Sequence, residues 1–185
     1  MAPHAPPKAE KRREAVDTFN IALVVVRLGR RILLVHERKF GRSWYLPAGR
    51  VDPGETFAAA AMRETLEEVG LDLRALGARR LGQLDDHPSL KQRSWARFTV
   101  VPVVYAIEGD PPLTLDAREV AEAMWVPLEE VRRTQGSMLW WFRPLKAIPV
   151  KLPMRLPRWQ WRGLTIWGLT YGMLRELMER AESAP

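Results

Sequence analysis

Residues 49–71 read GRVDPGETFAAAAMRETLEEVGL. The stretch begins with turn-forming residues, among them Asp52-Pro53-Gly54. From Thr56 onward it contains strong helix formers, including four consecutive alanines, and no helix-breaking residue before Gly70. Because glycine is the preferred residue just beyond the end of a helix, the stretch predicts a loop followed by a helix that ends at Gly70.

Three carboxylates share one face of this predicted helix. Glu64, Glu67 and Glu68 stand at positions i, i+3 and i+4, which lie next to one another on a helix surface. Such a cluster is unfavourable unless a cation lies among the carboxylates, and Mg²⁺ binds through a few carboxylates, waters and substrate phosphates. Arg63 can reach Glu67 on the next turn, and Glu55 can reach Arg63 from the loop. A solvated acidic helix face is the alternative interpretation.

The spacing of these residues resembles the signature of the Nudix hydrolases. That signature is a glycine, five residues, Glu, seven residues, Arg-Glu, two residues, Glu-Glu, one residue, Gly and an aliphatic residue. Every fixed position is filled here, by Gly49, Glu55, Arg63, Glu64, Glu67, Glu68, Gly70 and Leu71. Thr65 departs from the pattern, since the family usually has an apolar residue there. A match of this length favours the metal site over the solvated acidic face.

The resemblance implies a fold and an activity. The expected fold is α+β in class, an α/β/α sandwich with a mixed β-sheet and the signature helix laid against it. The expected reaction is hydrolysis of a nucleoside diphosphate linked to another moiety, by attack of water on phosphorus. Cations that neutralise the pyrophosphate and a base that activates water would both assist this attack.

The resemblance also assigns roles to individual residues. Glu64, Glu67 and Glu68 are the expected ligands of Mg²⁺, with Mn²⁺ as the alternative metal, and the carbonyl of Gly49 or of Ala48 is expected to complete the site. Glu55 and Arg63 are expected to hold the loop and the helix in register.

The expected catalytic residues are Glu64, Glu67 and Glu122. Glu64 is a candidate general base inside the signature, and Glu119 and Glu122 are candidates outside it. Either of the last two is equally well interpreted as an exposed acid at a strand end.

Substrate contacts are expected from three further residues, Trp44, Arg50 and Arg97. The aromatic pair Trp44-Tyr45 is alternatively interpreted as core packing. His87 stands in a predicted loop, where solvation is the alternative to a substrate contact.

The composition limits the remaining possibilities. The 185 residues suit one domain, and the net charge of +7 favours anionic partners such as a nucleotide. The absence of cysteine excludes disulfides and thiol catalysis. No signal-type segment and no apolar run of about 18 residues is present, so we expect a cytoplasmic protein without membrane insertion.

The chain is predicted to have three parts. Residues 1–16 are expected to form a disordered arm and residues 17–135 the Nudix domain core. Residues 136–185 are expected to form a basic extension rich in Trp and Pro, with a C-terminal helix, packed on the same domain.

Apolar patterning predicts the elements of the core. Strands are expected at residues 19–27, 32–36, 74–84, 95–107 and 119–126, with a short extended piece at 44–47, a loop at 85–88 and a short helix at 128–133. A terminal helix is expected at 164–180. Pro102 suggests an edge or bulge position for its strand.

Residues 131–175 contain nine basic residues, five of the eight tryptophans and no acidic residue. This segment is expected to form the wall of an anion-binding pocket, a subunit interface that would make a homodimer, or a surface that rests on an anionic membrane. Plain core packing is the fourth alternative.

Two resemblances disagree about the substrate. Residues 44–56 and 95–101 look like the branch that cleaves nucleoside di- and triphosphates, including oxidised purine nucleotides. Residues 166–170 look like the coenzyme A pyrophosphatase branch, although residues 37–46 lack that branch's additional motif. We therefore expect a nucleotide-type small-molecule substrate and no stable nucleic acid partner. The alternatives are a coenzyme A or nucleotide-sugar pyrophosphatase and a non-catalytic nucleotide-binding regulatory module.

Overall fold

The computed structural model describes residues 21–28, 30–37, 43–90, 97–142 and 152–182, so the arm expected at residues 1–16 lies outside the described residues. The elements follow in the order β1 (Ile21–Leu28), β2 (Arg31–Glu37), β3 (Ala48–Arg50), α1 (Phe57–Val69), β4 (Arg79–Gln83), β5 (His87–Leu90), β6 (Arg97–Ile107), β7 (Val120–Pro127), α2 (Leu128–Arg132), β8 (Gly136–Phe142), β9 (Leu152–Trp161), β10 (Leu164–Trp167) and α3 (Gly168–Glu182).

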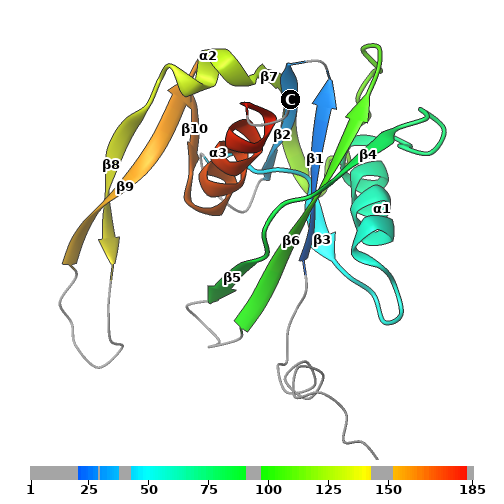
Figure 1. Ribbon diagram of the computed structural model, residues 1–185, viewed down its shortest axis with the longest axis horizontal. Coiled ribbons are helices and arrows are strands. Elements are labelled where there is room, and N and C mark those ends of the chain that lie inside the picture. The colour runs from blue at the N-terminus through cyan, green and yellow to red at the C-terminus, as the bar shows by residue number, and fades with distance from the viewer. Residues whose placement is uncertain (1–20, 29, 38–42, 91–96, 143–151, 183–185) are drawn as a thin grey trace, which may run out of the picture.

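The main sheet is mixed, as expected. Its strands run in the order β4-β6-β1-β2-β7, with β3 beside β1 and β5 beside β6 (Figure 1). Strands β1 and β6 are parallel, and the other pairs in this sheet are antiparallel. Strand β3 leads from this sheet directly into the loop before α1, which places the signature residues at the sheet.

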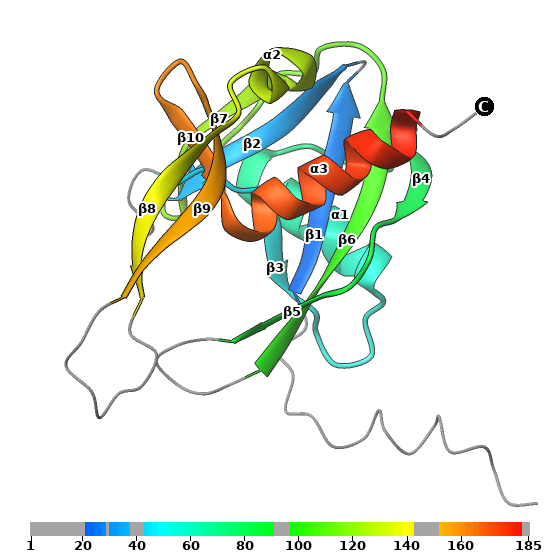
Figure 2. The same ribbon diagram turned by 60° about the vertical axis from the view of Figure 1, so that its left-hand side comes forward.

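Each face of the main sheet has its own hydrophobic core. Helix α1 packs on one face, where Leu33 and Val35 of β2 meet Ala60 and Ala61 of the helix. Helix α3 and the second sheet cover the other face (Figures 1 and 2). The α+β fold with helices on both sides of a mixed sheet is therefore confirmed.

Helix α1 begins and ends where the sequence predicts. The hydroxyl of Thr56 accepts a hydrogen bond from the amide of Ala59 and caps the first turn. Gly70 ends the helix in the left-handed conformation at φ 72°. The polar residue in the apolar position of the signature, Thr65, is fully buried and donates its hydroxyl to the carbonyl of Ala61 at 2.8 Å, so burial leaves this hydroxyl satisfied.

Several predicted boundaries are wrong. Residues 164–167 form strand β10 and not the first turn of the terminal helix, because they pair with β9. His87 and Pro88 begin strand β5 and do not lie in a loop. Strand β6 lies inside the sheet and not at its edge. Its neighbours β4 and β5 pair with it on either side of Pro102, so neither strand needs an amide donor from this proline. The carbonyl of Pro102 accepts a hydrogen bond from the amide of Leu84 in the segment between β4 and β5.

A second, antiparallel sheet with the order β10-β9-β8 was not predicted. Its base belongs to the core of the domain, since Trp159 of β9 and Ile166 of β10 are buried together with Ile32 and Leu34 of the main sheet. Its outer part, the β8–β9 hairpin, extends away from the main sheet (Figure 1). None of the helices in the described ranges is long and apolar enough to cross a membrane.

Candidate active site

Arg63 ties the signature loop to the signature helix. Its Nε and Nη2 atoms donate to the two carboxylate oxygens of Glu55 at 3.1 and 3.0 Å, and Nη2 also donates to the carbonyl of Arg50 at 2.7 Å. Its Nη1 atom donates to Glu64 at 2.7 Å and to Glu67 at 3.1 Å. The planar guanidinium therefore holds the loop and two signature carboxylates at once, and it keeps the pKa of Glu55 below its ordinary value.

Glu64 lies directly against Gly49. A Cβ atom added to Gly49 would come within 1.7 Å of the Cδ atom of Glu64 and within 1.9 Å of its Oε1 atom. Glycine is therefore required at position 49 because the carboxylate of Glu64 approaches the backbone there, and not because of an unusual backbone angle. Burial raises the pKa of Glu64, and the contact with Arg63 partly offsets this shift.

Glu68 is the most deeply buried acid of the site, with 4% of its surface exposed. The backbone amide of Ala48 donates a hydrogen bond to its Oε2 atom at 3.3 Å. Burial, together with the negative charges of Glu37 and Glu64, raises the pKa of Glu68 to about 8. A carboxylate in this position is costly when it is charged and uncompensated.

Four carboxylates influence one another at this place. Glu37, Glu64 and Glu119 all contribute to the raised pKa of Glu68. Glu37 was missed in the sequence analysis, because an acid in a Glu-Arg-Lys run is typical of a solvated surface. The available signal was strand alternation, since Leu33, Val35 and Glu37 project to the same face of β2, the face covered by α1.

The donor set fits a divalent cation in its chemistry. Carboxylate and carbonyl oxygens are the ligands that Mg²⁺ prefers, and the buried negative charge calls for a cation. In the described part of the chain, however, no three acidic or histidine side chains are already arranged as a metal cluster. Arg63 contacts Glu64 through Oε1 and Glu67 through Oε2, so one oxygen of each carboxylate is engaged by the guanidinium and the second oxygen is chemically able to bind a metal.

The predicted site residues divide into two groups. The structure brings together Glu64, Glu68 and Gly49, with Glu55 and Arg63 around them, whereas Glu67 has 58% of its side chain exposed and lies on the outer side with Arg63. Glu119 reaches the same group from the start of β7.

Glu122 lies apart from this group. It stands opposite His36 in the register of β2 and β7, on the sheet face opposite α1. There it lines a cavity of about 310 Å³ together with His36, Trp44 and Arg162. The rings of His36 and Trp44 stack at 5.5 Å, and Arg162 reaches the cavity from the turn between β9 and β10. The structure thus does not place Glu122 among the signature carboxylates.

The structure says less about Arg50 and Arg97, the two arginines that are expected to contact substrate. The carbonyl of Arg50 accepts a hydrogen bond from Arg63, and its side chain is exposed. The backbone of Arg97 begins strand β6, where it pairs with Leu90, and its side chain lies outside the described set. Their role in substrate binding stays a prediction.

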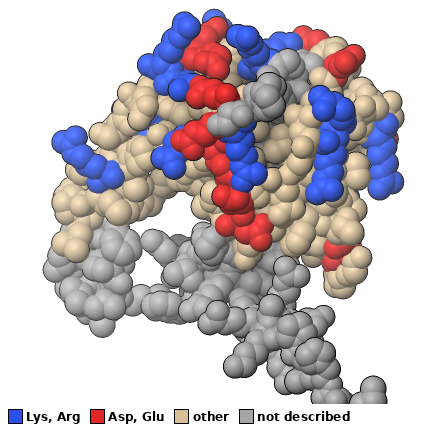
Figure 3. All heavy atoms as spheres, viewed as in Figure 1, with Lys and Arg blue, Asp and Glu red and all other residues tan. Residues whose placement is uncertain are grey.

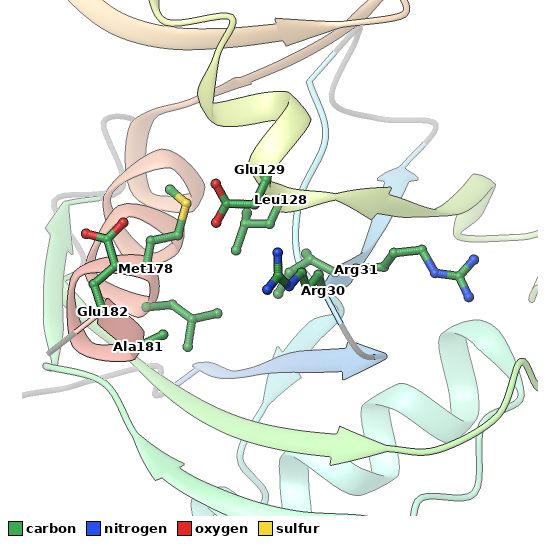
Figure 4. A pocket seen from close by; sticks show the side chains of 9 residues that line it. Arg30, Arg31, Leu128, Glu129, Met178, Ala181 and Glu182 are labelled. Carbon is green, nitrogen blue, oxygen red and sulfur yellow. The ribbon is translucent and has the colours of Figure 1, made fainter. Parts of the chain in front are cut away.

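A second cavity, of about 210 Å³, lies between the β1–β2 turn, α2 and α3 (Figure 4). Its floor is apolar and includes Ile32, Leu128 and Met178. Arg30 points toward this cavity, whereas Arg31 extends away from it and pairs with Asp110 at 3.6 Å (Figure 4). The cavity lies on the α3 side of the main sheet, so it is separate from the signature carboxylates.

The sequence profile of one family, described as NUDIX domain, matches residues 18–145. This match covers more than half of the chain, and together with the signature geometry it shows that the chain belongs to the Nudix hydrolase family, a group of pyrophosphohydrolases.

Curated relatives agree with this assignment. An uncharacterized Nudix hydrolase from Escherichia coli is 30% identical over 144 residues, which cover 77% of this chain and 69% of that protein. A putative 8-oxo-dGTP diphosphatase from Mycobacterium tuberculosis is 33% identical over 72% of this chain and 63% of its own length. An 8-oxo-dGDP phosphatase from Homo sapiens is 40% identical over 38% of this chain. The match spans only 22% of that human protein and 41% of Nudix hydrolase 3 from Caenorhabditis elegans.

Solved structures share the fold. A Nudix hydrolase from M. smegmatis, RenU, has a TM-score of 0.59 at 18% identity and covers 90% of this chain and 87% of its own. An Ap4A hydrolase from C. elegans, solved as a binary complex, has a TM-score of 0.53 at 22% identity, over 63% of this chain and 85% of its own. At these identities the likeness concerns the fold alone.

Proposed function

We propose that the protein is a Mg²⁺-dependent pyrophosphohydrolase that cleaves a nucleoside di- or triphosphate, with oxidised purine nucleotides as the first candidates. The observation that carries the proposal is the buried carboxylate of Glu68, surrounded by Glu37, Glu64 and Glu119 beneath the Ala48-Gly49 backbone. Two curated relatives support the substrate class, since their names specify 8-oxo-dGDP and 8-oxo-dGTP.

The proposed metal ligands are Glu64, Glu68 and a backbone carbonyl at Ala48 or Gly49, with Glu67 as a further ligand. The metal would neutralise the phosphate oxygens and orient the phosphorus for attack by water. The chain itself excludes bulk water from Glu68 by burial.

A carboxylate whose pKa is raised by its surroundings is suited to hold a proton near neutral pH. Glu64 has such a raised pKa, so it remains the general-base candidate within the signature. Glu119 is the candidate outside it, because its charge acts on Glu64 and Glu68.

The cavity around Trp44 supports a nucleotide as substrate, and we assign it the base. Trp44 belongs to the core and is only 6% exposed, but it lines this cavity beside His36, so the His36 ring and the exposed edge of Trp44 can contact a purine. The carboxylate of Glu122 can accept hydrogen bonds from ring or exocyclic N–H groups. This assignment gives Glu122 a role in substrate binding instead of the catalytic role predicted from the sequence. Glu122→Gln should then raise KM while leaving kcat within a few-fold, because an exchanged acceptor weakens binding rather than chemistry.

The decisive test is a release assay for phosphate and pyrophosphate with Mg²⁺ or Mn²⁺. The panel contains the nucleoside triphosphates and diphosphates, 8-oxo-dGTP, 8-oxo-dGDP, ADP-ribose, dinucleoside polyphosphates and coenzyme A. Turnover that is strongest on an oxidised purine nucleotide and lost in Glu68→Gln supports the proposal. Glu108→Gln, which changes an exposed acid away from the site, serves as the matched control.

Two other outcomes would replace the proposal. Preference for coenzyme A or a sugar nucleotide would move the protein to another substrate branch. Tight nucleotide binding without turnover of any compound would make it a regulatory module. Such modules often lose signature carboxylates, whereas all four signature glutamates are present here.

A further inference from the structure

Strand β8 is an unprotected sheet edge. It is the last strand of the β10-β9-β8 sheet, and no other described strand pairs with its free side. Figures 1 and 2 both show it on the outside of the molecule. In most proteins an exposed edge strand is kept from pairing with another chain by its short length, by charged residues, by proline or by a bulge. The seven residues GSMLWWF contain no charge and no proline, and their pairing with β9 is regular.

Large apolar side chains surround this edge. On β8, Leu139 is 53% exposed and Trp141 is 56% exposed. On the neighbouring β9, Leu152 is 49% exposed and Met154 is 42% exposed. All four lie in the outer rows of the hairpin, and they are four of the seven large hydrophobic residues exposed in the described structure. They lie on two faces, because Leu152 and Met154 pair with Phe142 and Trp140, whereas Leu139 and Trp141 project to the opposite face. The two exposed residues of β8 itself mark its edge as an interaction surface.

We propose that β8 is the dimerisation edge of the protein, which pairs antiparallel with β8 of a second copy. A two-fold axis at Leu139, the middle residue of the strand, would set Leu139 opposite Leu139, Met138 opposite Trp140 and Ser137 opposite Trp141. Each face of the joined strands would then carry matching apolar rows, and aromatic and aliphatic cross-strand pairs stabilise a sheet. The result is one six-stranded sheet across both copies.

The charges permit a second copy at this edge. The hairpin side of the molecule is basic: residues 131–175 contain no acid, and the outer hairpin in Figure 3 shows tan and blue spheres without red. Two basic surfaces would ordinarily repel each other. Strand β8 itself is uncharged, however, and Arg155 stands on β9, so the two copies of Arg155 would be three strand spacings apart, about 14 Å. At that distance the repulsion is largely screened at physiological ionic strength.

The exposed side chains are needed as well as the backbone pairing. A stable interface buries roughly 800 Å² on each partner, more than a seven-residue strand supplies by its backbone alone. Leu139 and Trp141 contribute directly, since they lie on the paired strand. An anionic lipid surface is the competing partner, because it too suits basic and tryptophan-rich segments.

The test measures the mass of the full chain by sedimentation over a range of concentrations. The wild-type protein should move from 21.3 kDa toward twice that mass as its concentration rises. Leu139→Lys should remain at the mass of one chain, because two lysines would face each other at the axis. The matched control is Met154→Lys, which places the same charge on β9 away from the paired strand and should dimerise like the wild type.

A cross-link gives the geometry directly, because the chain contains no cysteine. Leu139→Cys should give a covalent dimer under mild oxidation, since directly opposed residues have Cβ atoms about 4.5–5.5 Å apart, near the distance a disulfide needs. Met154→Cys should not. A wild-type monomer at every concentration, a Leu139→Lys dimer or a dimer without the cross-link would overturn the proposal. Binding of monomers to vesicles of anionic lipid that high salt abolishes would assign the hairpin to lipid instead.

Discussion

Replacing Glu68 by glutamine should stabilise the metal-free protein. The folded structure raises the pKa of Glu68 from 4.5 to about 8. A group whose pKa is raised on folding contributes its full stability below its unfolded pKa, and that contribution is lost as the pH rises toward the folded pKa. The wild-type protein in EDTA should therefore lose stability between about pH 4.5 and pH 8, whereas a neutral glutamine avoids this loss.

The size of the effect follows from the shift. At about 1.36 kcal/mol for each pH unit, the proton that Glu68 takes up on folding lowers the free energy of unfolding by an upper limit of about 3 kcal/mol at pH 7 and about 1 kcal/mol at pH 5. Glu68→Gln should thus exceed the wild type by an amount that grows with pH. Mg²⁺ should reverse the order at pH 7, since binding at 1,000 times its dissociation constant stabilises the wild type by about 4.1 kcal/mol.

The assay is urea unfolding at several pH values between 5 and 8, with EDTA and then with Mg²⁺. Glu108→Gln is the control, because it removes an exposed carboxylate and should follow the wild type under every condition. The reasoning is refuted if Glu68→Gln is less stable than the wild type in EDTA at pH 8. It is also refuted if the two proteins depend on pH in the same way.

Three further substitutions test the geometry of the site. Gly49→Ala should lower turnover by roughly 10- to 100-fold, because its Cβ displaces the carboxylate of Glu64. The free energy of unfolding should change by less than about 1 kcal/mol. Unchanged kinetics would contradict the close approach of Glu64 to Gly49. Gly70→Ala should cost about 2 kcal/mol or more in urea unfolding, since φ is +72° and the new Cβ would meet Thr114 at 2.8 Å; a neutral change would refute the strain. Arg63→Lys should destabilise by about 1–3 kcal/mol and lower activity, because an ammonium cannot replace the guanidinium fork; full activity would exclude the positioning role.

The sequence predicted the signature region best, because its interactions are local. The start of the helix at Thr56, its end at Gly70 and the contact of Arg63 with Glu55 all involve residues less than ten positions apart. Glu37 escaped prediction because its neighbour Glu68 is brought near by the sheet, across 31 positions of sequence. No local pattern specifies that meeting.

The placement of Glu122 depended on the face of a strand. Ala123 and Trp125 face α1, so Glu122 faces the other side with Met124. A one-residue uncertainty in a strand boundary exchanges the two faces, which made this acid an ambiguous candidate in the sequence.

The second sheet was hidden for a different reason. Strands β8 and β9 pair with each other and carry apolar residues on both faces, such as Trp140 and Trp141 on β8, so they lack the polar and apolar alternation that predicts a strand. Residues 164–167 resembled the start of a helix because their apolar character continues into α3.

The position of α3 along the chain bears on how the protein is synthesised. The core on the α3 face of the main sheet is completed by side chains from Trp159 to Met178, among them Leu164 and Leu174. A ribosome releases the strands of the main sheet first, at roughly 5–20 residues per second, so this apolar face stays uncovered for several seconds. We expect nascent chains that stop before residue 159 to bind chaperones and those that include α3 to be released. Segments that are made later thus decide when the earlier ones become stable.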